Sequence, residues 1–132
     1  MKQKTFLPSI EAVHAIQEYV SSHLPQNFRN RDTVSRVELV IEEVVINIIN
    51  YAFRDEDNGT ITVGIEEKNG SLEVEIRDNG AAFDPLLSEE PDLKAPIEER
   101  EVGGLGIFFV KSLCKDVTYA REAGNNVLRL IL

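Results

Sequence analysis

Apolar residues recur at helical spacing along one stretch of the chain, Arg36 to Phe53, which contains neither glycine nor proline. This pattern predicts a helix, capped at its start by Asp32 or Thr33. From Val44 onward, apolar residues occupy nearly the whole circumference, so we expect that half of the helix to be buried. A narrow polar stripe crosses the apolar surface at steps of three and four residues, and it consists of Glu43, Asn47, Asn50 and Arg54.

Around this helix, hydrophobic alternation predicts two β-hairpins. The first joins Thr60–Lys68 to Ser71–Arg77 through Asn69-Gly70, a strong signal for a type I′ turn. The second joins Val117–Arg121 to Asn126–Leu132 through the three residues Ala123, Gly124 and Asn125.

Shorter patterns predict a strand at Lys2–Leu7, a helix capped by Ser9 that runs to about Leu24, and a helix at Ile107–Lys115. Between the two hairpins, Asp84–Val102 has no regular period and carries many charges. A loop of that length is uncommon in a compact domain unless it is functional or mobile. The order predicts a single domain, residues 1–132, with an α+β two-layer sandwich whose helices cover one face of a mostly antiparallel mixed sheet.

Charge and composition exclude several kinds of partner. Acidic residues outnumber basic ones by 23 to 14, which gives a formal net charge of −9. A chain this acidic repels phosphate backbones, so we do not expect it to bind nucleic acid. No apolar run approaches the roughly 20 residues that span a bilayer, the first residues lack the apolar core of a signal peptide, and Cys114 is the sole cysteine. We therefore expect a cytoplasmic protein without membrane contact.

Two side chains of the polar stripe suit phosphate chemistry. Glu43 and Asn47 stand four residues apart, so both project from one face of the helix. A carboxylate there can activate a hydroxyl group or a water, and an amide oxygen can join a Mg²⁺ ion that otherwise uses water and phosphate oxygens. The alternative is that the stripe simply faces solvent.

Two glycine-containing segments can each be interpreted in two ways. Asp78-Asn79-Gly80 follows a strand, where the carboxylate can meet an amino group on a flat heterocycle, or where the three residues form a plain turn. Gly103-Gly104-Leu105-Gly106 begins a helix, where backbone N–H groups can hold a phosphate or the glycines can act as a hinge. The segment Gly103–Gly106 fits neither a P-loop nor a Rossmann motif.

The order of these features, an ExxxN helix, a hairpin, DxG, a long loop and GGLG at a helix start, resembles the Bergerat-fold (GHKL) ATPases. The length and the ending GGLGIFFVKSLCKDVTYAREAGNNVLRL are most similar to the small anti-sigma-factor serine kinases of the RsbW and SpoIIAB type. The resemblance covers nearly the whole chain.

This resemblance implies a set of roles in binding ATP and Mg²⁺. Glu43 matches the general base, Asn47 the Mg²⁺ ligand, and Asp78 the residue that reads adenine, with Gly80 letting the base approach. Residues 84–102 match the ATP lid. The remaining candidate contacts to the nucleotide are Asn50, Ala82, Arg100, Gly103, Gly104, Leu105 and Gly106.

The sequence departs from the family pattern at two positions. Ala82 replaces the second glycine of the usual DxGxG motif, so the backbone has less freedom there. Asn50 stands where many sensor kinases carry a basic residue, which leaves Arg100, Arg54 and Lys111, with Mg²⁺, to meet the phosphate charge.

The resemblance implies an ATP-dependent protein-serine kinase that phosphorylates a small STAS-type antagonist protein and regulates a sigma factor by partner switching. Homodimerisation is plausible on the same ground. The alternative is a nucleotide-dependent protein-binding module without significant kinase turnover. A fragment of a sensor histidine kinase is disfavoured, because the chain has no room for a pair of dimerisation helices.

Overall fold

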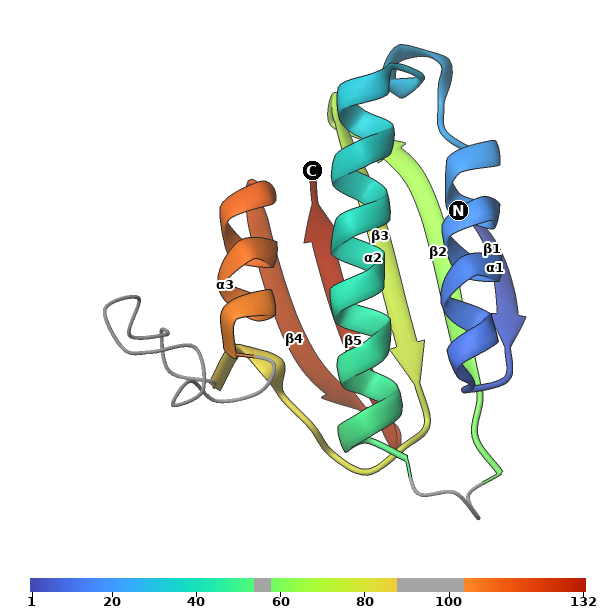
Figure 1. Cartoon of the computed structure of the whole chain (residues 1–132), viewed down its shortest axis with the longest axis vertical. Helices are drawn as coiled ribbons and strands as arrows, with labels where there is room; N and C mark the ends of the chain where they lie inside the picture. The colour runs from blue at the N-terminus through green and yellow to red at the C-terminus, as the bar shows by residue number, and fades with distance from the viewer. Residues whose placement is uncertain (54–57, 88–103) are drawn as a thin grey trace.

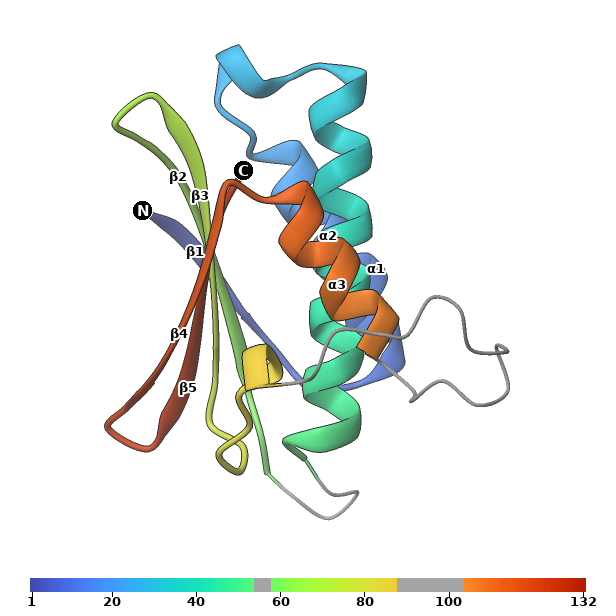
Figure 2. The same cartoon turned by 90° about the vertical axis from the view of Figure 1, so that its left-hand side faces the viewer.

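The computed structural model describes residues 1–53, 58–87 and 104–132 of the chain. These residues form two layers, a five-stranded sheet and three α-helices that cover one of its faces (Figures 1 and 2). The opposite face of the sheet carries no helix from the described ranges (Figure 2). This arrangement confirms the predicted α+β sandwich.

The sheet consists of β1 (Lys2–Phe6), β2 (Ile61–Lys68), β3 (Ser71–Asp78), β4 (Asp116–Glu122) and β5 (Asn125–Ile131). Their order across the sheet is β1-β2-β3-β5-β4, and each of the four neighbouring pairs is antiparallel. No parallel pair occurs among the described strands, so the sheet is antiparallel rather than mixed. Both predicted hairpins are present.

The two hairpin turns have the backbone geometry that their sequences favour. Asn69 and Gly70 have φ of 53° and 78°, and Ala123 and Gly124 have φ of 49° and 82°. Positive φ at both central residues matches the twist of the adjoining strands. Asn125, which was predicted to lie in the second turn, is instead the first residue of β5.

The central helix, α2 (Arg31–Tyr51), begins at a different cap from the one predicted. Asn30 is extended, with φ of −134°, and its Oδ1 accepts a hydrogen bond of 2.9 Å from the backbone N–H of Thr33. An extended residue whose side chain bonds the third helical N–H is the N-cap. The prediction of Asp32 or Thr33 as the cap was therefore wrong, since both lie in the first helical turn.

The flanking helices are α1 (Ile10–Ser22) and α3 (Gly104–Leu113). Ser9 is the N-cap of α1 as predicted, although its side chain makes no capping hydrogen bond. Helix α3 begins three residues before the predicted Ile107, because the glycine segment forms its first turn rather than preceding it. None of the helices in the described ranges is long and apolar enough to cross a membrane.

Helix α2 lies over the middle of the sheet, between α1 and α3 (Figure 1). Its inner face contributes the largest share of helical side chains to the core, namely Val37, Val40, Ile41, Val44, Val45 and Ile48. These pack with inward-facing strand residues such as Ile61, Leu72 and Ile76. Tyr51 lies in the half of the helix that was predicted to be buried, yet it is 46% exposed, because the last turn of α2 reaches the end of the sheet.

Gly80 has a packing role beyond the one suggested by its motif. A Cβ atom at Gly80 would collide with the backbone carbonyl group of Ala52, the residue that ends α2. The same carbonyl accepts a hydrogen bond of 2.8 Å from the backbone N–H of Ala81. Gly80 is not among the residues with positive φ, so the position requires glycine for close approach rather than for backbone conformation.

We expect Gly80→Ala to lower the free energy of unfolding by about 1–3 kcal/mol, since the rigid backbone of α2 must shift to admit the methyl group. Ala82→Gly is the matched control, because Ala82 is exposed and has no positive φ. That control should cost less than about 1 kcal/mol. Urea unfolding followed by circular dichroism measures both, and equal stability of Gly80→Ala and the parent would contradict the packing role.

Candidate functional site

The polar stripe of α2 divides into a buried part and an exposed part. Asn47 is only 5% exposed, Glu43 is half-buried, and Asn50 is exposed. Arg54 lies outside the described residues. The stripe therefore does not simply face solvent, because Asn47 is buried and Glu43 is partly buried.

Asn47 is held in a fixed orientation by its own helix. Its Nδ2 donates a hydrogen bond of 2.9 Å to the backbone carbonyl of Glu43. Among the described residues no donor reaches its Oδ1. Within the part of the chain that the structure describes, the amide oxygen therefore has no competing donor.

Glu43 contacts the first turn of α3. A Cβ atom at Gly106 would collide with its carboxylate oxygen Oε2, so glycine at that position makes room for the Glu43 side chain. Partial burial raises the pKa of Glu43, and the neighbouring charge of Glu42 raises it further. A carboxylate with a raised pKa is a stronger base, which suits a group that accepts a proton.

Asp78, the last residue of β3, is only 2% exposed. Its Oδ1 accepts hydrogen bonds from the backbone N–H of Gly80, at 3.0 Å, and from Nδ2 of Asn126, at 2.9 Å. No donor among the described residues reaches Oδ2. Burial raises the pKa of Asp78, while the two hydrogen bonds and the charge of Arg121 lower it by a smaller amount.

Asn126 on β5 connects Asp78 to its surroundings, although no sequence motif predicted this role. Its Oδ1 accepts hydrogen bonds from the Tyr119 hydroxyl at 2.5 Å, from the backbone N–H of Phe83 at 3.1 Å, and from Arg121 Nη1 at 3.1 Å. Its Nδ2 also donates to the carbonyl of Ala81 at 2.8 Å. Strand alternation contained a usable signal, since Asn126 is in phase with the buried Leu128 and Leu130.

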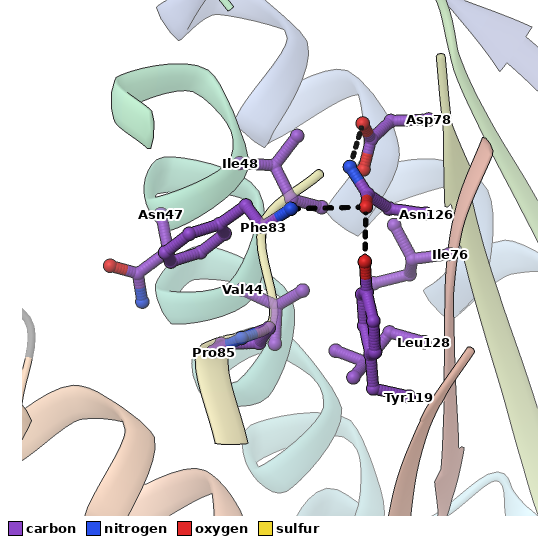
Figure 3. Close-up of a pocket in the computed structure, with 10 residues that line it drawn as sticks. All are labelled: Val44, Asn47, Ile48, Ile76, Asp78, Phe83, Pro85, Tyr119, Asn126 and Leu128. Carbon is purple, nitrogen blue, oxygen red and sulfur yellow. Dashed lines mark hydrogen bonds between the residues drawn. The ribbon is translucent and has the colours of Figure 1, made fainter. Parts of the chain in front are cut away.

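A pocket lies between α2 and the sheet, and Asn47 and Asp78 both line it (Figure 3). Its volume, about 10 Å³, is enough for roughly one water molecule. Phe83 and Pro85 occupy the side of the pocket away from the sheet (Figure 3). The ring of Tyr51 stacks on Phe83 with centroids 5.2 Å apart.

The described residues contain no group of three or more His, Cys, Asp or Glu side chains that can hold a metal ion. Asn47 Oδ1 is a neutral oxygen of the kind that Mg²⁺ accepts beside water and phosphate oxygens.

The remaining predicted contacts are only partly described. Gly104, Leu105 and Gly106 form the first turn of α3, and Gly106 places that turn against Glu43. Arg100 and Gly103 lie outside the described residues, as does most of the predicted lid. Ala82 is exposed without positive φ, so replacing the usual glycine causes no backbone strain there.

The fold, with an acidic residue at the end of a central strand and an ExxxN helix packed over the sheet, is that of a histidine-kinase-like domain. The chain belongs to the family described as the histidine kinase-like ATPase domain, whose model matches residues 6–132.

Curated relatives of the chain include serine-protein kinases named RsbW. That of Listeria monocytogenes serotype 4a (strain HCC23) is 29% identical over 101 residues, which cover 74% of this chain and 64% of the relative. That of Bacillus cereus (strain B4264) is 31% identical over 101 residues, covering 74% and 62% respectively. The matched region thus spans less than two thirds of these relatives.

Among solved structures, the fold is similar to the histidine kinase domain of the blue-light activated histidine kinase of Erythrobacter litoralis EL346. The TM-score is 0.56 at 16% sequence identity, over 91% of this chain and 60% of that chain. This similarity confirms the fold.

Proposed function

We propose that the chain is an ATP-dependent protein-serine kinase that phosphorylates a small STAS-type antagonist protein and regulates a sigma factor by partner switching. The observation that carries the proposal is that Asn47 and Asp78, from α2 and β3, line one pocket, with Glu43 one turn of α2 away. The similarity to serine-protein kinases named RsbW supports the choice of a serine as acceptor.

In this proposal the adenine amino group donates to Oδ2 of Asp78, the oxygen that accepts no hydrogen bond from the described residues. The pocket is too small for a purine, so Phe83 and Pro85 must move outward when the nucleotide binds. The phosphates then extend along α2 toward Asn47 and the first turn of α3.

Glu43 accepts the proton of the substrate serine while the serine oxygen forms a bond to the γ-phosphorus. The bond from the γ-phosphorus to the β-phosphate oxygen breaks at the same time, which releases ADP. Asn47 Oδ1 would be one ligand of a Mg²⁺ ion, which would supply neutralisation of the phosphate charge. The remaining work of the protein is positioning.

The test is to incubate the chain with γ-labelled ATP, Mg²⁺ and a co-encoded STAS-domain protein. We expect label on a serine of that partner, and loss of the label when Glu43→Ala replaces the parent chain. Tight ATP binding without transfer to any candidate partner would instead support the alternative, a nucleotide-dependent binding module. Ala82 and Asn50, where the chain departs from the family pattern, keep that alternative relevant.

A further inference from the structure

The Asn126 side chain can take only one orientation in its surroundings. Arg121 Nη1 and the backbone N–H of Phe83 are donors only, and both meet Oδ1. The Asp78 carboxylate and the carbonyl of Ala81 accept, and both meet Nδ2. Reversing the amide would place donors against donors and acceptors against acceptors.

This fixed amide determines which oxygen of Asp78 is available. Nδ2 of Asn126 and the N–H of Gly80 both donate to Oδ1, which directs their hydrogen bonds away from Oδ2. Without Asn126, the carboxylate keeps only the bond from Gly80 and can rotate about its terminal torsion, where rotational wells are broad.

We propose that Asn126 is a positioning residue that sets the base selectivity of the site by holding Asp78 Oδ2 toward the ligand's amino group. Tyr119 supports this role, because its hydroxyl makes the shortest of the three hydrogen bonds to Asn126 Oδ1. This inference rests on the proposed binding of ATP and adds the residue that makes the choice of base.

The experiment compares the dissociation constants of ATP and ITP, which differ at the group that Asp78 would read. ITP carries an oxygen where ATP carries the amino group. For Asn126→Ala we expect ATP to bind about 10–100-fold more weakly, the loss typical of a misplaced hydrogen bond to a charged group. ITP binding should change less than about 3-fold on the same principle, so the ATP/ITP preference falls at least about 3-fold.

Tyr119→Phe keeps the ring and removes only the hydroxyl, so it carries the test if Asn126→Ala fails to fold. It should reduce the ATP/ITP preference in the same direction by about 3-fold or more. Val20→Ala controls for lost stability, since Val20 is a buried residue of α1 and does not line the pocket. It should leave the preference unchanged.

Equal weakening of ATP and ITP by Asn126→Ala, or by Tyr119→Phe where the first variant does not fold, would overturn the inference and reduce Asn126 to a structural residue. Failure of the parent chain to bind either nucleotide would instead refute the proposed function. The two failures are therefore distinguishable in one set of titrations.

Discussion

Asp78→Asn should weaken ATP binding by at least about 100-fold and leave the fold intact. The substitution changes no volume, and the new Oδ1 can still accept from Gly80 and Asn126. At the other position, however, an N–H₂ group replaces Oδ2 and meets the adenine amino group donor to donor. A hydrogen bond to a charged group contributes about 1.5–3 kcal/mol, and replacing it with a repulsive contact costs more.

The same substitution should make the unliganded protein more stable at neutral pH. The pKa of Asp78 is raised above its ordinary value of 3.8, chiefly by burial, so its ionisation opposes folding. This penalty is absent below the unfolded pKa and develops as the pH rises through the folded pKa. The stability gain of Asp78→Asn should thus be present at pH 7 and disappear as the pH falls toward 4.

Isothermal titration with ATP and urea unfolding between pH 4 and pH 8 measure the two effects on the same samples. Gain of stability with loss of binding would mark a residue whose charge is kept for a ligand. Unchanged ATP affinity would show that adenine is read elsewhere, and loss of stability at pH 7 would show that the hydrogen bonds to Oδ1 outweigh burial.

Much of the fold was predictable because its local signals agree with its tertiary structure. Asn69-Gly70 and Ala123-Gly124 adopt positive φ, and alternation on both sides of each turn places apolar residues under the helices. The cap of α2 was misplaced because Asn30, Asp32 and Thr33 are all good capping residues. Only the extended backbone of Asn30 decides among them.

The hydrogen-bond network around Asp78 was not predictable from motifs. It depends on the register that places Asn126 directly opposite Asp78 across β3 and β5, and on Tyr119 and Arg121 reaching over from β4. The close approach of Gly80 to Ala52 likewise depends on where α2 ends relative to β3. Such contacts join segments far apart in sequence, so no local pattern encodes them.

Glu43 and Glu42 provide the sharpest test of the proposed catalysis, because they are adjacent in sequence but differently placed. Glu43 is half-buried against Gly106, whereas Glu42 is exposed about 100° round the helix. Glu43→Gln should lower the rate of phosphoryl transfer by about 10²–10⁴-fold, the usual contribution of a general base. ATP affinity should change only a few-fold, since Glu43 acts on the acceptor hydroxyl.

Glu42→Ala should leave transfer near the parental rate and produce a specific shift in its pH dependence. The charge of Glu42 raises the pKa of Glu43, so its removal lowers that pKa. Glu43 then stays ionised at lower pH, and the acidic limb of the rate profile should move to lower pH. Initial rates of partner labelling from pH 5 to pH 8 measure this shift, and equal loss from Glu42→Ala and Glu43→Gln would mean that the wrong face of α2 has been assigned to the chemistry.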